Sequence, residues 1–226
     1  MPQRKQSQGA CVFCGREMTK GGLSKHLKTC PQRQEAIKAA EKAGPKQRLY
    51  HLQIQDAWSP DFWLHVEMNG GATLKELDKY LRAIWLECCG HLSRFSIGGW
   101  SGNEIPMSRK IEQVFRPGVE LTHIYDFGTS SETLVKAVEV REGQPLTKHP
   151  IYLMARNHMP EALCAECGEP AGWLCMECLI EEGEWVTFCE KHAQEHPHDE
   201  YGEPMPLVNS PRLGMCGYDG PAEPPY

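Results

Sequence analysis

Residues 159–226 hold six cysteines in a spacing that constrains their fold more than any other feature of the chain. Two Cys-x-x-Cys pairs are followed by a Cys-x-x-His pair and further candidate ligands. In order, these residues are Cys164, Cys167, Cys175, Cys178, Cys189, His192, His196, His198 and Cys216. A single redox Cys-x-x-Cys would not bring a second pair with it. The spacing is typical of tetrahedral zinc sites, so we expect metal rather than disulfides or redox thiols.

The gap between the two Cys-x-x-Cys pairs is short for consecutive pairs that share one zinc. It favours a cross-brace, in which alternate pairs share a metal, and resembles B-box and MYND modules. The first zinc would then bind Cys164, Cys167, Cys189 and His192. The second would bind Cys175, Cys178, His196 and His198, with Cys216 as a rival for either histidine. Closed, thiolate-rich sites of this kind are structural, because a catalytic zinc keeps one position open.

A third set of ligands lies near the N-terminus, at Cys11, Cys14, His26 and Cys30. The spacing resembles that of C2H2-type fingers with a cysteine in place of the last histidine. His26 and Cys30 are four residues apart and would share one face of a short helix. So small a unit could hardly fold without its metal. We therefore expect three zinc ions per chain, all structural.

Charge is distributed unevenly along the chain. Residues 1–48 carry 11 Lys/Arg against three Asp/Glu, whereas residues 159–226 carry two against 14. The basic head suits phosphates, which predicts contact with nucleic acid or a nucleoprotein. The predicted contact residues are Lys20, Lys25, Lys28 and Arg33. A solvated basic helix with no partner is the alternative. The acidic tail is a poor nucleic-acid surface and would suit a basic protein partner.

The middle of the chain has the pattern of an α+β domain. Residues 48–55 and 62–68 alternate between polar and apolar side chains, as strands do. A capping box at Thr73 and Glu76 then begins an amphipathic helix. Residues 121–127 and 132–140 are two further β-rich runs, and the short loop between them predicts a hairpin.

Three features of this domain carry a family resemblance. They are the strand that contains Trp63, the helix TLKELDKYLRAIW (73–85) and the motif YDFG (125–128). Together they resemble the plasmid pRiA4b ORF-3-like family, whose members are often found near mobile elements. The resemblance implies the fold rather than an activity. The family continues the motif with an acidic residue, an aromatic residue and a histidine. This chain instead has Thr129, Ser131 and Thr133, so any role of those side chains has been lost.

An enzyme is the alternative hypothesis for the middle domain. His123 and Asp126 lie close together in the sequence and could line a cleft. The competing interpretation is a strand end at which the Asp side chain caps a turn. The vicinal pair Cys88 and Cys89 is expected to be buried packing, because adjacent cysteines seldom bind one metal well.

These patterns predict an α+β protein with a small zinc finger (1–31), a helical linker (32–47), a central domain (48–158) and an acidic cross-brace module with two zincs (159–226). The basic, polar N-terminus has no apolar core of a secretory signal, and no apolar run approaches membrane-spanning length, which favours the cytoplasm. We expect a non-enzymatic adaptor with no membrane or small-molecule partner. A self-contained protein, whose basic head docks on its acidic tail, is a further possibility.

Overall fold

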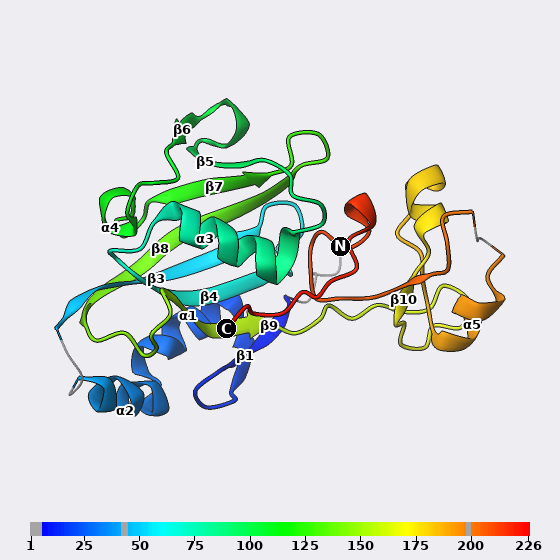
Figure 1. Ribbon diagram of the computed structural model, residues 1–226. Coiled ribbons are helices and arrows are strands. Elements are labelled where there is room, and N and C mark those ends of the chain that lie inside the picture. Colours follow the sequence, from blue (N-terminus) through cyan, green and yellow to red (C-terminus); the bar gives the residue numbers. More distant parts are fainter. Residues whose placement is uncertain (1–5, 42–44, 198–199) are drawn as a thin grey trace.

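One antiparallel sheet organises most of the chain (Figure 1). The structure, a computed structural model, describes residues 6–41, 45–197 and 200–226. Among these residues, nine strands form the sheet in the order β2-β1-β9-β4-β3-β8-β7-β5-β6. The strands are β1 (Gln8–Cys11), β2 (Glu17–Thr19), β3 (Gln47–Asp56), β4 (Trp63–Asn69), β5 (Ser93–Ile97), β6 (Asn103–Ile105), β7 (Glu120–Tyr125), β8 (Ser131–Gly143) and β9 (Ile151–Asn157). The expected hairpin is present as β7 and β8, which pair from Glu120↔Lys136 to Tyr125↔Ser131.

The helices are short, and none within the described ranges is long and apolar enough to cross a membrane. They are α1 (Lys20–Thr29), α2 (Pro31–Ala40), α3 (Leu74–Leu81), α4 (Ile111–Val114) and α5 (Glu190–Glu195), with helical turns η1 (Arg82–Leu86), η2 (Gly99–Ser101), η3 (Cys178–Glu182) and η4 (Met215–Gly217). A second sheet is formed by β10 (Trp173–Leu174), β11 (Thr187–Phe188) and β12 (Met205–Pro206). The fold class is therefore α+β, as the sequence predicts.

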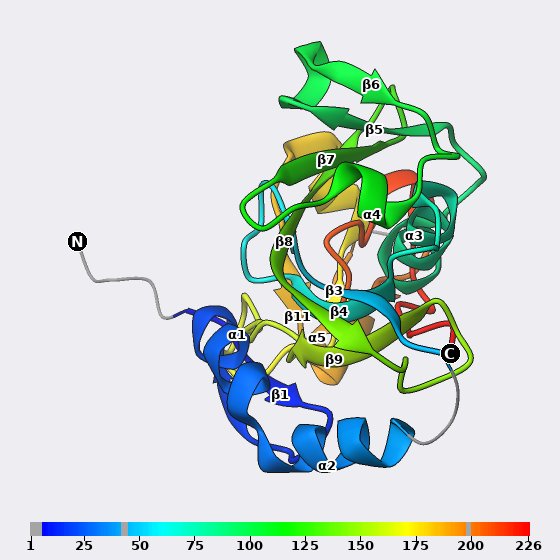
Figure 2. The same cartoon turned by 90° about the vertical axis from the view of Figure 1, so that its left-hand side faces the viewer.

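Strand β4 is buried on both faces because helices cover the sheet on both sides. Leu64 and Val66 belong to the main core, together with the apolar face of α3. Trp63 and Glu67, on the alternate positions, face the N-terminal helices instead. Figure 2 shows α1 and α3 on opposite sides of the sheet. Because successive side chains of a strand point to opposite faces, the side chains of β4 alternate between the main core and the core beneath the head.

Helix α3 begins where its capping box predicts. The carboxylate of Glu76 accepts hydrogen bonds from the backbone N–H of Thr73 at 2.6 Å and from its hydroxyl at 2.9 Å. These bonds satisfy groups that a helix N-terminus leaves unpaired. Leu74 and Leu77 are completely buried, so the predicted apolar face is the one that packs on the sheet.

The head does not form a module separate from the central domain. Strand β1 pairs with β9 and so extends the central sheet. A side chain at Gly9 would collide with the carbonyl of Arg156, which explains a glycine at this close approach. Leu23 and Leu27 of α1 pack against Trp63. The boundary expected after residue 31 therefore does not divide the fold. The predicted helical linker does contain a helix, α2, which an ion pair between Arg33 and Glu67 holds against β4.

The last part of the chain returns to the central domain. We call residues 207–226 the C-terminal strap and residues 159–206 the Cys/His module. Ser210 donates a hydrogen bond to the carbonyl of Trp85 at 2.7 Å. Arg156 donates to the carbonyls of Asn209 and Ala222 at 2.6 and 2.7 Å. The region expected to form one zinc module thus consists of a module and a strap that binds the central domain.

Two buried histidines join the head to the sheet. The Nε2 of His65 lies 3.0 Å from the carbonyl oxygen of Lys20, which can only accept, so Nε2 carries the proton. The Nδ1 of His65 then accepts from Nε2 of His51 at 2.9 Å. Burial lowers the pKa of His65 to about 4. Burial, aided by the charges of His65, Arg33 and Lys28, lowers the pKa of His51 to about 2. Both rings are neutral in the folded protein.

These histidines should make the fold sensitive to acid. Below pH ~6.5 the unfolded chain takes up a proton at each position and the folded chain does not, so stability falls as the pH falls. His51→Phe removes one of the two sites. Between pH 7.5 and 5.5, we expect the wild type to lose about 1.4 kcal/mol more unfolding free energy than this variant. Urea unfolding of both proteins at pH 7.5 and pH 5.5 measures the difference. Protonation of metal ligands affects the two proteins equally and therefore does not contribute to it. Equal losses would contradict the prediction.

Candidate metal centres

The head brings its four predicted ligands together. Cys11 ends β1, Cys14 lies in the turn that follows, His26 is on α1, and Cys30 ends that helix. Their ligand atoms all lie within 4.8 Å of one another, and the Cys14 Sγ is 3.2 Å from the His26 Nε2. The knuckle turns through Gly15, whose φ of +72° favours glycine. Burial raises the pKa of Cys11 to about 11, so this sulfur is a neutral thiol unless a cation is bound beside it.

The first ligand set of the Cys/His module combines the first and third pairs. It consists of Cys164, Cys167, Cys189 and His192. The Nδ1 of His192 lies 3.3 Å from the Sγ of Cys164 and 3.5 Å from that of Cys189. Burial raises the pKa of Cys164, but the backbone N–H groups of Cys189, Cys167 and Glu166 outweigh it and lower the pKa to about 6. Backbone donors directed at sulfur stabilise the thiolate that a metal requires.

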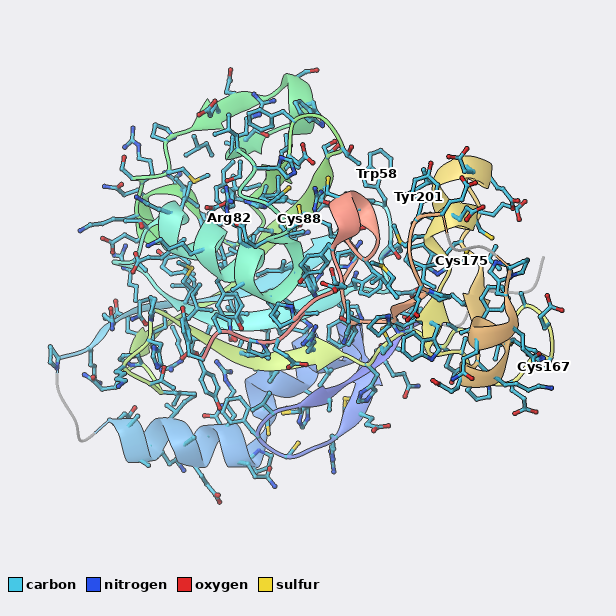
Figure 3. The ribbon with its side chains drawn as sticks, turned by 45° about the vertical axis from the view of Figure 1, so that its right-hand side comes forward. Trp58, Arg82, Cys88, Cys167, Cys175 and Tyr201 are labelled. Atoms are coloured by element: carbon cyan, nitrogen blue, oxygen red, sulfur yellow. The ribbon has the colours of Figure 1, made fainter. Side chains whose placement is uncertain are left out.

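The second set combines Cys175, Cys178 and His196. The Nε2 of His196 lies 3.5 Å from the Sγ of Cys178. His198, the expected fourth ligand, lies outside the described residues. The pairs therefore alternate between the two sets, as the cross-brace hypothesis expects and sequential pairing does not. Figure 3 shows Cys167 and Cys175 in different parts of the same small module.

Cys216 is not a ligand of this module in the structure. It lies with Cys88, Cys89 and His91 at the surface of the central domain. The prediction that Cys216 could replace His196 or His198 as a ligand is therefore wrong, because the strap places Cys216 beside the central domain and not beside Cys175. The expectation that Cys88 and Cys89 form buried packing is also wrong. Cys89 is exposed and Cys88 is half-buried. The sequence does carry one signal for this cluster, a histidine two residues after the vicinal pair.

Of the four predicted nucleic-acid contacts, Lys25 and Lys28 are exposed on α1. Lys20 is half-buried, and desolvation lowers its pKa. Arg33 is only 3% exposed and forms an ion pair with Glu67 at 2.9 Å. The prediction that Arg33 contacts a phosphate is therefore wrong, because its guanidinium is already bound within the protein.

The residues of the enzyme hypothesis do not share a cleft. His123 is completely buried and lies 2.8 Å from the Oδ1 of Asp78. Asp126 is 4% exposed and accepts a hydrogen bond from Arg212 at 2.7 Å. The two side chains are bound to different partners, and His123 has no surface that a substrate could reach.

The donor chemistry of the clusters fits a soft divalent cation. Four Cys/His clusters among the described residues have the proximity that metal binding requires. Thiolate and imidazole ligands favour zinc over hard cations such as magnesium and calcium. Three of the clusters contain at least one buried cysteine, as in closed sites that support a fold.

Comparisons with known proteins add little to this geometry. No family model matches the chain, and no curated protein is similar to it. A solved structure of a protein of unknown function from Methanosarcina mazei Go1 is similar to part of it, with a TM-score of 0.42 and 17% sequence identity. That match covers 54% of this chain and 76% of the other.

Proposed function

We propose that the protein is a zinc-stabilised adaptor without enzymatic activity. In this proposal its basic head binds nucleic acid and its acidic Cys/His module binds a basic protein partner. The observation that carries it is the separation of charge in space. Helices α1 and α2 lie at one end of the molecule, and α5 and β10 lie at the other (Figure 1). This arrangement favours two binding surfaces over the self-contained alternative, in which α1 and α2 would meet the acidic Cys/His module.

Zinc is the proposed metal at the three sites of the head and the Cys/His module. The head and the first module set each offer three cysteines and one histidine, and the second module set offers two cysteines and one histidine among the residues described. Zinc bound to the two four-ligand sets has all its positions filled by protein and serves as a fixed cross-link. His198, which lies outside the described residues, is the proposed fourth ligand of the second module set. The chain's own residues then fold around each cross-link and present their charged side chains outward.

The proposed nucleic-acid surface is the exposed side of α1. Lys25 and Lys28 are three residues apart and therefore neighbours on one face of the helix. Lys38 on α2 and Arg16 in the finger loop are also exposed. The opposite side of α1 is occupied by Leu23 and other core residues, so the helix faces solvent only with its basic side. A surface of this size suits phosphate contacts without sequence specificity.

The proposed protein-binding surface is the acidic loop of the Cys/His module. Glu181, Glu182 and Glu184 are exposed in and after η3. Ile180 and Trp185 beside them are 51% and 52% exposed. Acidic side chains around exposed apolar ones are complementary to a basic segment that also carries apolar anchors.

The nucleic-acid part is tested by fluorescence anisotropy of labelled duplex DNA and single-stranded RNA between 50 and 200 mM salt. We expect the K25Q/K28Q variant to bind on the order of tenfold more weakly and to lower the salt slope by about two, because two phosphate contacts are lost. The matched control is K75Q/K79Q, which removes the same charge from exposed positions on α3.

Failure of the wild type to bind either nucleic acid at the lowest salt would refute this part of the proposal. Equal losses for the two variants would also refute it, because the effect would then come from net charge alone. Binding of a protein rather than nucleic acid by the head would leave an adaptor with two protein surfaces.

A further inference from the structure

A fourth group of metal-type ligands lies between the central domain and the C-terminal strap. We call Cys88, Cys89, His91 and Cys216 the strap cluster. Their ligand atoms lie within 4.8 Å of one another. The Sγ atoms of Cys88 and Cys89 are 3.5 Å apart, and the Cys89 Sγ is 2.9 Å from the His91 Nε2. Figure 3 shows Cys88 beside the helical turn of the strap.

The backbone is bent so that these side chains meet. Cys216 has a φ of +53°, a left-handed conformation that is uncommon for residues other than glycine. Gly90, between the vicinal cysteines and His91, has a φ of +77°. Such a conformation at a non-glycine residue costs free energy and persists where the surrounding structure holds it. At Cys216 it brings the sulfur of the strap to the sulfurs of the central domain.

A buried arginine supports the same sulfur atoms. Arg212 has no exposed surface, and its Nε and Nη2 each lie 3.4 Å from the Sγ of Cys88. Its Nη2 is also 3.5 Å from the Sγ of Cys216 and 2.7 Å from Asp126. Three thiolates and one imidazole around a divalent cation carry one net negative charge. A buried guanidinium that donates to two of the thiolates stabilises this charge from outside the ligand sphere, while Asp126, 2.7 Å from the Nη2 of Arg212 and 3.3 Å from the Nε2 of His91, adds one negative charge.

The use of cysteine in the chain points the same way. The sequence has 11 cysteines, and each belongs to one of the four clusters. The strap cluster has the same composition, three cysteines and one histidine, as the clusters in the head and in the first part of the module. Every cysteine of this chain thus lies beside other side chains of the kinds that bind metal.

From these observations we infer that the strap cluster binds a fourth zinc ion, which fastens the C-terminal strap to the central domain. Cys88, Cys89 and His91 come from one side of the junction and Cys216 from the other. The cluster contains no buried ligand, unlike the other three. Its metal is therefore the most accessible of the four and should be the first to leave.

The test is native mass spectrometry of the full chain as purified in the presence of zinc. We expect four zinc ions per wild-type chain and three in both the C216S and C89S variants. Both positions are exposed, so these variants keep the packing of the core. M215A is the matched control, because Met215 is an exposed neighbour in the same turn and not a ligand. It should retain four ions.

Graded chelation with a thiol-alkylating reagent gives a second readout. One ion should leave before the others, and alkylation of Cys89 and Cys216 should begin at that step. Three ions in the wild type, with both thiols alkylated before any chelator is added, would overturn the inference. Four ions in C216S and C89S would overturn it as well. So would a mass lower by two hydrogens with both thiols blocked, because the cluster would then be a disulfide.

Discussion

Replacing Glu67 with glutamine is expected to lower the free energy of unfolding by about 3–5 kcal/mol. Glu67 is 4% exposed and lies between two arginines. Its Oε2 accepts from Arg33 at 2.9 Å and from Arg141 at 2.8 Å, and its Oε1 accepts from Arg141 at 2.6 Å. Glutamine has nearly the same shape but no charge. Two guanidinium groups would then remain in the protein without a counter-ion, and the amide N–H₂ would face other donors.

The effect is measured by urea unfolding of the wild type and E67Q at pH 7.5. E142Q is the matched control, because Glu142 is an exposed residue at the same end of β8 as Arg141. It should change the unfolding free energy by less than about 0.5 kcal/mol. Because Arg33 belongs to α2, limited proteolysis of E67Q should also release the head first. A cost below about 1 kcal/mol would show that the three charged groups do not depend on one another.

The second large effect is expected from Cys164→Ser. The buried apolar residues of this part of the Cys/His module are Cys164, Cys175, Cys178, Phe188 and Ala193. Three of these five residues are proposed metal ligands, so little core remains once a metal is lost. Structural zinc contributes on the order of 10 kcal/mol to the folding of small domains. We expect C164S to bind one ion fewer than the wild type and to lose the ordered structure of residues 159–197 and 200–206.

Hydrogen exchange read by mass spectrometry separates this result from global unfolding. Amides of β10 and β11 should lose protection in C164S, whereas those of β3 and β4 should keep it. E166Q controls for the position, since Glu166 is exposed in the same knuckle and is not a ligand. If C164S loses one ion but the amides of β10 and β11 stay protected, the module folds without that metal site and the prediction is wrong.

Local patterns in the sequence predicted much of the site. The spacing within each Cys-x-x-Cys pair follows from the geometry of a turn that directs two sulfurs to one point, so the ligands of the head and module could be grouped without a structure. The capping box of α3 is equally local. The alternation of polar and apolar residues along 62–68 predicts strand β4. It does not predict that the polar face of this strand is buried beneath the head.

Contacts between distant parts of the chain were not predictable in this way. Cys216 meets Cys88 only because the strap returns to the central domain, and no spacing rule connects them. Arg33 was assigned to a surface because a lysine-rich helix precedes it. Its partner Glu67 is 34 residues away in the sequence, and only the folded sheet brings them together. Charged residues are expected outside unless a partner is known, and the partner here is tertiary.

The position of β1 in the sheet bears on how the protein would meet a second copy of itself. A strand at the border of a sheet presents unpaired N–H and C=O groups to other chains. In this protein β1 pairs with β9 and β2 pairs with β1, so β9 is an inner strand and β2 forms the border. The turn that contains Cys11 and Cys14 connects β1 to β2. Loss of the metal proposed there would uncover β9 and leave a template on which a second molecule can add a strand. We therefore expect the metal-free protein to self-associate more readily than the metal-bound protein.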